Sequence, residues 1–206
     1  VGSEMCIRDR LRKRQYQLSD DESWSLHVAR LMIGGKIQNY RNILKRYIRD
    51  YGENEDINRA VQVLERAKRD VLKAQDKTEL IGYEGMASNA YFEVLPILIL
   101  NQKTDFPFHG RNRRPPKDAV NAMLSFAYTL IANDVAAALE TVGLDPYVGF
   151  LHTLRPGRTS LALDMMEELR AYLGDRFILS LINKRQISVK DFLFQGDNGV
   201  VMTDKG

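Results

Sequence analysis

The feature that most restricts the fold of this chain is helical periodicity that returns in one segment after another. In "DDESWSLHVARLMIGGKIQNYRNILKRYIRD", residues 20–50, apolar side chains recur at spacings of three and four, which is the pattern of an amphipathic helix. The candidate N-caps before it are Asp20, Asp21 and Ser23. Gly34 and Gly35 lie inside the predicted helix. Glycine weakens a helix, so we expect close packing or a local bend there.

Further helices are predicted along most of the chain. Their ranges are 54–77, 78–100, 117–143 and a continuous helix from Ser160 to 187. A loop, "QKTDFPFHGRNRRPP", separates the third helix from the fourth, and only residues 191–203 have strand-like character. The 78–100 segment is apolar on most sides and is expected to be central. The fold class is therefore all-α, a single multi-helix domain.

Composition narrows the class of protein. Hydrophobic residues make up 44% of the chain and charged residues 28%, which is typical of a folded globular protein. The net charge is only +3, but 30 basic residues are available to cluster against a polyanion. The apolar run "VLPILIL" is too short to span a bilayer. One cysteine gives no disulfide framework and fits a reducing cytoplasm, so we expect a cytoplasmic protein.

The two ends of the chain lead to expectations about its origin. "VGSEMCIRDR", residues 1–10, back-translates to a sequence like a transposon-type sequencing adapter, so we expect read-through there rather than natural protein. The alternative is a genuine N-terminus. Residues 11–22 are polar and are predicted to be a linker, and the helical domain is predicted to occupy 23–206. The ending "DNGVVMTDKG" also suggests truncation.

Two groups of acidic and histidine residues are candidates for chemistry. Glu84 lies among apolar residues on the 78–100 helix, where a buried carboxylate needs a cation; the alternative is that it faces solvent. His152 precedes Asp164, Glu167 and Glu168, which share one helix face at spacings of three and four. One histidine with carboxylates suits Mg²⁺ or Mn²⁺ better than structural zinc. A solvated charged surface is the alternative.

Two arginine-rich loops are candidates for phosphate binding, because guanidinium groups match phosphate oxygens. The first carries Arg111, Arg113 and Arg114, and the second, "LRPGRTS", carries Arg155 and Arg158. The second loop lies between His152 and the acids, where its arginines could neutralise a phosphodiester. Ordinary solvated loops are the alternative for both.

Taken together, four motifs resemble the CRISPR-associated integrase of spacer acquisition, the Cas-one family. The residues in these motifs are most similar to those of the type I-C branch. The motifs are "YEGMASNAYF", "GRNRRPPKDAVNAMLSFAYTLI", "GLDPYVGFLHTLRPGRTSLALDMMEELR" and "LINKRQI". The resemblance implies that this is the helical C-terminal catalytic domain and that a β-rich N-terminal domain is missing.

The resemblance also implies roles for particular residues. Glu84, His152 and Glu167 match the family's ligands for a divalent ion, Mg²⁺ or Mn²⁺, and Asp164 matches a further acidic position near the metal. Glu168 is a weaker candidate for a metal ligand than Glu167. The arginine loop matches a region expected to meet DNA. The implied reaction is attack of a 3′-hydroxyl of captured DNA on a phosphodiester of the CRISPR repeat, and water as nucleophile would make the same site an endonuclease.

The implied partners are DNA, a second copy of the chain in a homodimer, and the small second Cas protein, Cas-two. Two other functions fit the residues taken singly. One is a non-catalytic helical DNA-binding module that uses only the arginine loops. The other is a structural helical scaffold, which would show no salt-dependent DNA binding.

Overall fold

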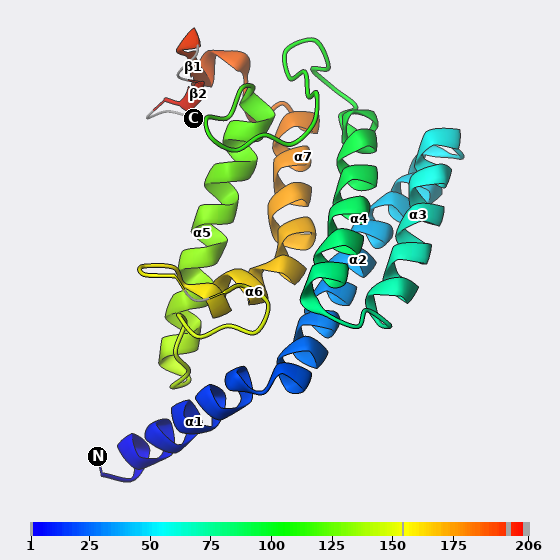
Figure 1. The fold of residues 1–206 in the computed structure, drawn as a ribbon. Coiled ribbons are helices and arrows are strands. Elements are labelled where there is room, and N and C mark those ends of the chain that lie inside the picture. Colours follow the sequence, from blue (N-terminus) through cyan, green and yellow to red (C-terminus); the bar gives the residue numbers. More distant parts are fainter. Residues whose placement is uncertain (1, 154, 197–198, 204–206) are drawn as a thin grey trace.

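A computed structural model of the chain describes residues 2–153, 155–196 and 199–203, with the side chains of residues 2–7 left out. The described part is built from helices with one small sheet (Figure 1). The helices are α1 (Gly2–Asp20), α2 (Glu22–Tyr51), α3 (Glu55–Val71), α4 (Lys77–Leu98), α5 (Ala119–Thr141), α6 (Ser160–Leu169), a π-helical turn (Arg170–Asp175) and α7 (Arg176–Asn183). The all-α fold class predicted from the periodicity is confirmed.

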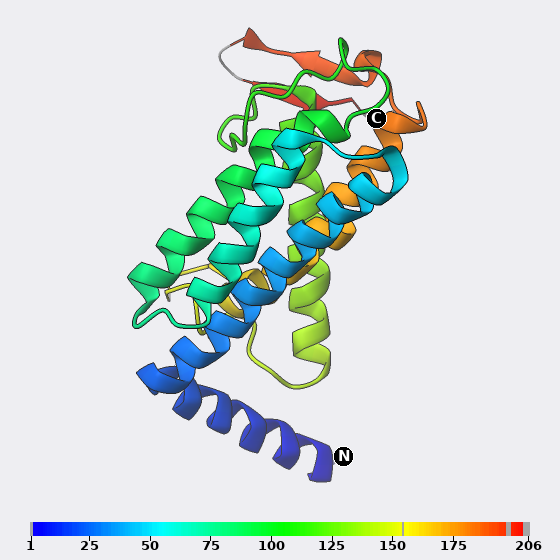
Figure 2. The ribbon, with the colours of Figure 1, turned by 90° about the vertical axis from the view of Figure 1, so that its right-hand side faces the viewer.

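The long helices form two groups that meet along α2. Helices α3 and α4 pack closely against each other and against α2, while α5, α6, the π-helical turn and α7 form the other group, and α6 also packs on α2 (Figures 1 and 2). Apolar side chains from both groups join in one main core. One part of the candidate site lies on α4, and the other lies on α6 and the loop before it. The packing of both groups on α2 brings the two parts together.

Acidic and amide side chains cap the starts of the long helices. Asp21 accepts hydrogen bonds from the backbone N–H groups of Ser23 and Trp24 at the start of α2, which confirms one of the three predicted caps. Asp118 caps α5 in the same way. At the other end of α5, Gly143 has a φ of 88°, a left-handed conformation that favours glycine and ends the helix near the predicted residue.

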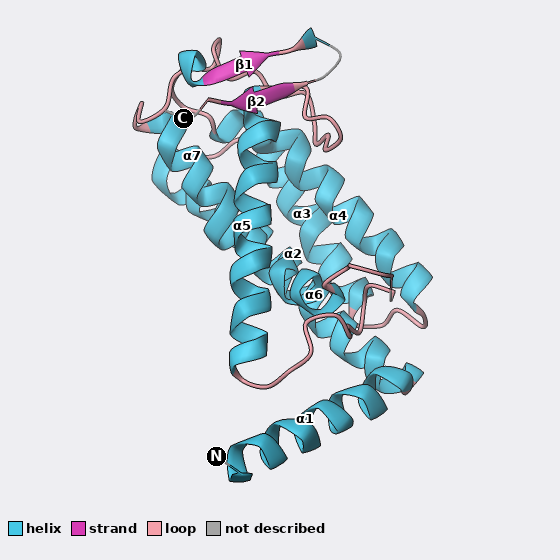
Figure 3. Cartoon of the chain, turned by 90° about the vertical axis from the view of Figure 1, so that its left-hand side faces the viewer, coloured by secondary structure: helices cyan, strands magenta, loops and turns pink. Residues whose placement is uncertain are grey.

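The strand-like segment forms a short antiparallel hairpin over one end of the bundle (Figure 3). Its strands are β1 (Phe192–Phe194), preceded by a single 3₁₀ turn at Val189–Asp191, and β2 (Val200–Met202). Phe192 and Val200 are buried against the core. The strand character predicted for 191–203 is confirmed.

Residues 11–20 of the predicted linker are helical, because α1 extends through Asp20; that residues 11–22 link to a further domain stays a prediction. Gln15 is only 4% exposed. Its side-chain amide donates to the carbonyls of Asp145 and Val148, 2.8 Å in each case, and accepts from the N–H of Asp145 at 2.8 Å. Polar contacts rather than an apolar stripe hold this helix, which is why its sequence looked like a linker. The read-through origin of residues 1–10 stays a prediction.

The continuous helix predicted from Ser160 to 187 is also corrected. A π-helical turn interrupts it between Leu169 and Arg176, and α7 ends at Asn183. Within the turn, a Cβ on Gly174 would lie 2.9 Å from Cε1 of Tyr128. Glycine therefore lets α5 approach closely at this point, and π-helical turns of this kind are frequent beside functional sites.

Helix α5 is the one described helix that is long and apolar enough, by length and composition only, to cross a membrane. Core helices pass the same test of length and composition. In the structure α5 packs on α6, α7 and the hairpin.

Candidate active site

Three residues predicted as metal ligands line one cavity of about 270 Å³. Glu84 comes from α4, His152 from the loop before α6, and Glu167 from α6. Arg158 lines the same cavity. The fold thus brings together residues that are far apart in the sequence, although their role as ligands stays a prediction.

The three side chains are not arranged as a ready-made cation cage. Within the described ranges, no three histidine, cysteine, aspartate or glutamate side chains form a group that could hold one ion. Instead, the two glutamates pair with one lysine, and the histidine pairs with an aspartate.

Lys36 of α2 lies between the two glutamates and was missed by the sequence reasoning. Its Nζ pairs with Oε1 of Glu84 and lies 2.7 Å from Oε2 of Glu167. The second contact is an ion pair by distance, but its angles do not make a hydrogen bond. The signal was present, since Lys36 falls on the apolar stripe of α2 with Ile33 and Tyr40, where a charge must find a partner.

The charges around Glu167 keep it ionised despite its burial. Burial alone would raise the pKa of Glu167, but the positive charges of Lys36 and Arg170 outweigh burial and hold the pKa below its usual range. Nη2 of Arg170 lies 3.1 Å from Oε1 of Glu167. Burial likewise opposes the charge of Lys36, yet Tyr40 and the two glutamates raise the pKa of Lys36.

Asp164 fixes the loop that carries His152. It is fully buried. Oδ2 accepts the backbone N–H of Phe150 at 2.6 Å and of Leu151 at 2.9 Å, while Oδ1 accepts the N–H of His152 at 3.0 Å. Nδ1 of the His152 ring lies 2.6 Å from the same Oδ1. Both oxygens of Asp164 are therefore engaged by the loop and hold it in place, while a role for Asp164 as an additional acid at the metal stays a prediction.

The hydrogen bond to Asp164 also sets which ring nitrogen of His152 carries a proton. An ionised carboxylate can only accept, so Nδ1 of the ring carries a proton, and in the neutral imidazole Nε2 is then the acceptor. This arrangement, a carboxylate behind a ring nitrogen, is the usual support of a metal-binding histidine. His152 keeps 22% of its side chain exposed.

Glu168 is not among the residues that line this cavity. A Cβ on Gly35 would lie 2.7 Å from Cδ of Glu168, so the absence of a side chain on Gly35 makes room for it. The close packing predicted at the Gly34-Gly35 pair is confirmed at Gly35, and the ranking of Glu168 below Glu167 as a metal ligand stays a prediction.

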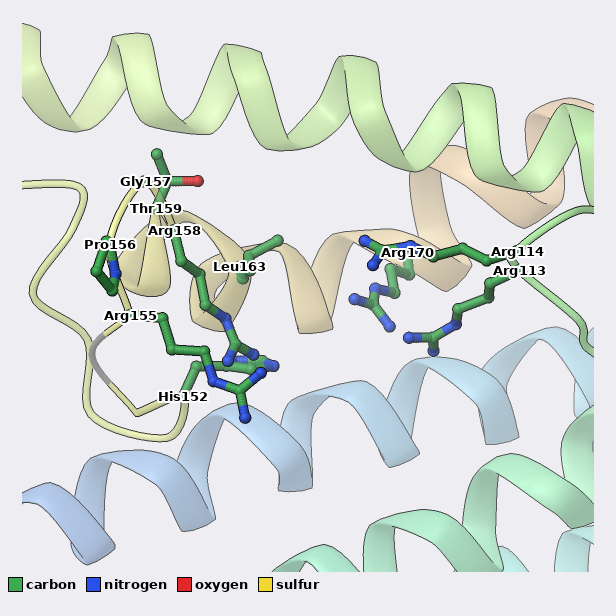
Figure 4. A pocket seen from close by; sticks show the side chains of 10 residues that line it. All are labelled: Arg113, Arg114, His152, Arg155, Pro156, Gly157, Arg158, Thr159, Leu163 and Arg170. Atoms are coloured by element: carbon green, nitrogen blue, oxygen red, sulfur yellow. The ribbon is translucent and has the colours of Figure 1, made fainter.

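A larger cleft, of about 770 Å³, opens beside the cavity. Figure 4 shows His152, Arg155 and Arg158 reaching into it from one side and Arg113, Arg114 and Arg170 from the other. Four of the five arginines predicted to meet DNA line this cleft, and Arg170 was missed. Its spacing of three from Glu167 on one helix was the available signal.

Arg111, the fifth predicted arginine, is not among the residues that line the cleft. Its guanidinium donates to Oδ1 of Asn121 at 2.8 Å and to Oγ of Ser125 at 3.1 Å, and its Cζ lies 5.4 Å from the centre of the Tyr128 ring. Burial lowers its pKa. Arg111 therefore anchors the arginine loop to α5 through these contacts.

A buried polar cluster lies behind Arg170. The Tyr128 hydroxyl donates to Oδ1 of the fully buried Asp175 at 2.5 Å. Burial raises the pKa of Asp175 to about 6, although the Tyr128 bond and the charges of Arg170 and Arg111 oppose the rise. Cζ of Arg170 lies 5.1 Å from the centre of the Tyr128 ring, so this cluster supports the arginine that pairs with Glu167.

A helical domain in which an arginine-lined cleft meets a cavity of acids and a histidine has the features expected of a protein that processes nucleic acids. The family model described as CRISPR associated protein Cas1 matches residues 4–206, and the chain belongs to this family. The family resemblance and the helical Cas1-domain fold predicted from the sequence are confirmed.

Two relatives are similar along most of this chain. A "CRISPR-associated endonuclease Cas1" of Leptospira interrogans serogroup Icterohaemorrhagiae serovar Lai (strain 56601) is 47% identical over 186 residues, covering 89% of this chain and 73% of the relative. "CRISPR-associated endonuclease Cas1 1" of Chlorobaculum tepidum is 47% identical over 197 residues, covering 94% of this chain and 57% of the relative. The chain thus spans only part of both proteins.

Solved structures share the fold. A Cas1 protein from Thermotoga maritima is 28% identical with a TM-score of 0.81, covering 95% of this chain and 59% of that one. A casposase bound to integration product is 26% identical with a TM-score of 0.79, covering 97% and 57%. One chain of a "Cas6-RT-Cas1--Cas2 complex" is 27% identical with a TM-score of 0.80, covering 93% and 21%.

Proposed function

We propose that this chain carries the active site of a divalent-metal-dependent DNA integrase and endonuclease that inserts new spacers into a CRISPR array. The observation that supports this function best is that the cavity of Glu84, His152 and Glu167 and the arginine cleft are contiguous, since His152 and Arg158 line both. The names of the relatives, endonucleases of the same family, agree with it.

The donor set fits Mg²⁺ or Mn²⁺. Two carboxylates and one imidazole are ligands that these ions accept. Oε2 of Glu167 is buried without a hydrogen bond, and Nε2 of the neutral His152 ring is left as an acceptor by the bond to Asp164. A bound ion would supply charge to a phosphodiester oxygen during displacement.

The chain's own residues would bind and orient the DNA. Arg155 and Arg158, on the same side of the cleft as His152 (Figure 4), would hold the phosphate under attack, and Arg113 and Arg114 a neighbouring phosphate. The 3′-hydroxyl of the incoming strand forms a new bond to phosphorus. The bond from phosphorus to the 3′-oxygen of the repeat breaks, and that oxygen leaves as a new 3′-hydroxyl. With water as nucleophile, the same geometry gives hydrolysis.

The proposed partners are spacer-precursor DNA, the CRISPR repeat, a second copy of the chain and the Cas2 protein, acting in the cytoplasm. A structural neighbour is bound to an integration product and others are parts of complexes with Cas2. The arginine cleft provides the complementary charge for DNA. The type I-C assignment stays a prediction.

The experiment is strand transfer and nicking of a branched DNA with Mn²⁺, using the 206-residue chain, its His152→Ala variant and, as a control, His27→Ala. His27 is exposed on α2 beside Trp24. We expect activity in the parent and control that disappears in His152→Ala while DNA affinity is kept. DNA binding without activity in any of the three proteins would favour the non-catalytic binding module. Full activity of His152→Ala would contradict the site.

A further inference from the structure

Lys36 is enclosed more completely than either of the two glutamates with which it pairs. Its side chain is 3% exposed, compared with 23% for Glu84 and 6% for Glu167. It pairs with one oxygen of each glutamate. The fold therefore fixes a cation between the two carboxylates proposed to bind the metal.

The two carboxylates are matched by two paired cations before any metal ion is added. Glu84 and Glu167 contribute two negative charges, and Lys36 and Arg170 contribute two positive charges. Ser88 also donates its hydroxyl to Oε1 of Glu84 at 2.7 Å, the oxygen that faces Lys36. A divalent ion that binds these carboxylates must compete with a cation that is already in contact with both.

The ammonium group of Lys36 also lies close to an aromatic ring that could stabilise its charge. Its Nζ lies 5.7 Å from the centre of the Tyr40 ring, within the range of a cation–π interaction. The Tyr40 ring is itself fixed by stacking on Tyr91, with the ring centres 3.9 Å apart. The ammonium group could therefore leave the carboxylates without losing every favourable contact.

We propose that Lys36 is an internal counter-ion: it holds Glu84 and Glu167 in place when no metal is bound, and it gives up both carboxylates when Mg²⁺ or Mn²⁺ binds. Lys36 thereby lowers and sets the metal affinity of the site. This inference rests on the proposed function, because it takes the two glutamates to be metal ligands. Lys36 is a positioning residue, and its effect is measurable without any catalytic turnover.

The experiment is a titration of the full chain with Mn²⁺ by calorimetry, comparing the parent with Lys36→Met and Lys36→Gln. Both variants remove the charge, and the glutamine keeps a hydrogen-bond donor for the carboxylates. Lys45→Met is the matched control, since Lys45 lies on the same helix, pairs with Glu65 at 3.2 Å and is half-exposed. We expect Mn²⁺ to bind the Lys36 variants about tenfold more tightly, because one nearby positive charge is gone, and to bind the control as it binds the parent.

Thermal unfolding with and without Mn²⁺ covers the case in which the loss of Lys36 weakens the fold. We expect Mn²⁺ to raise the melting temperature of the Lys36 variants more than that of the parent, because a ligand that binds only the folded state stabilises it. An equal rise in all proteins would overturn the inference. Variants that stay unfolded at saturating Mn²⁺ would overturn it as well, since Lys36 would then be a structural cation that the metal cannot replace.

Glu84→Gln separates this inference from the proposed function. If that variant binds Mn²⁺ as the parent does, the metal site itself is wrong. If it loses Mn²⁺ binding but the Lys36 variants bind no more tightly than the parent, the metal site stands and only the role of Lys36 fails.

Discussion

Nδ1 of His152 lies 2.6 Å from Oδ1 of Asp164, and the same carboxylate accepts three backbone N–H groups of the 150–152 segment. One buried aspartate therefore sets both the path of the loop and the tautomer of the histidine. A Cβ on Gly149 would lie 2.5 Å from Oδ2 of Asp164, so the residue before this segment must be small for the carboxylate to reach it.

Replacing Asp164 with asparagine should disrupt this arrangement. The amide nitrogen cannot accept from N–H groups, so at least one backbone donor loses its partner, at a cost of about 1–3 kcal/mol in the free energy of unfolding. We expect nicking activity to fall roughly 10- to 100-fold, as is usual when the support of a metal-binding histidine is removed. Urea unfolding and the nicking assay measure the two effects. Asp134→Asn, an exposed change on α5, should alter neither, and a parent-like Asp164→Asn would contradict the positioning role.

Replacing Arg113 and Arg114 together with glutamine should weaken DNA binding in a salt-dependent way. Both side chains line the cleft and are exposed. The slope of log affinity against log salt should become shallower by about 0.9 for each duplex phosphate that the protein no longer neutralises. Fluorescence anisotropy at several salt concentrations measures the slope. Arg66→Gln, an exposed change on α3, is the control; an unchanged slope in the double variant would mean that these arginines bind no phosphate.

Replacing Gln15 with alanine should loosen the segment that leads to His152. The variant loses three hydrogen bonds to Asp145 and Val148, with an expected loss of about 2 kcal/mol in stability, because buried backbone groups are left without partners. We expect faster amide hydrogen exchange in residues 144–152. Gln17→Ala, an exposed change on the same helix, should leave exchange unchanged. Protection of 144–152 equal to the parent's would show that α1 does not support this loop.

Replacing Asp175 with asparagine should change how stability depends on pH. The pKa of Asp175 is raised from 3.8 to about 6 by burial, so ionisation costs more in the folded chain than in the unfolded chain. The contribution of Asp175 to the stability of the parent therefore falls as pH rises from about 4 to about 6, by roughly 3 kcal/mol in total. The asparagine side chain does not ionise, so the stability of the variant relative to the parent should rise by this amount over that range. Denaturant unfolding at pH 4, 5, 6 and 7 measures it; parallel curves for the two proteins would contradict the raised pKa.

The long helices were predictable because their burial is periodic. The stripe on α2 and the caps at Asp21 and Asp118 are local signals that lie within a few turns of the residues that they organise. The predictions failed where long-range contacts decide the structure. Helix α1 is held by the 143–148 segment, and the turn at Arg170–Asp175 follows from packing against Tyr128 on α5.

The fold class, the family and the types of residue available for chemistry were readable from the sequence, since periodicity and motif order are properties of the chain alone. The contacts of each charged residue became visible only in the folded structure. Asp164 accepts hydrogen bonds from the backbone of the loop, and Arg111 donates to Asn121 on α5. Lys36 forms ion pairs with both Glu84 and Glu167. The physical reason is that a charged group can be buried only with its partners, and those partners lie on helices that are neighbours in space but not in sequence.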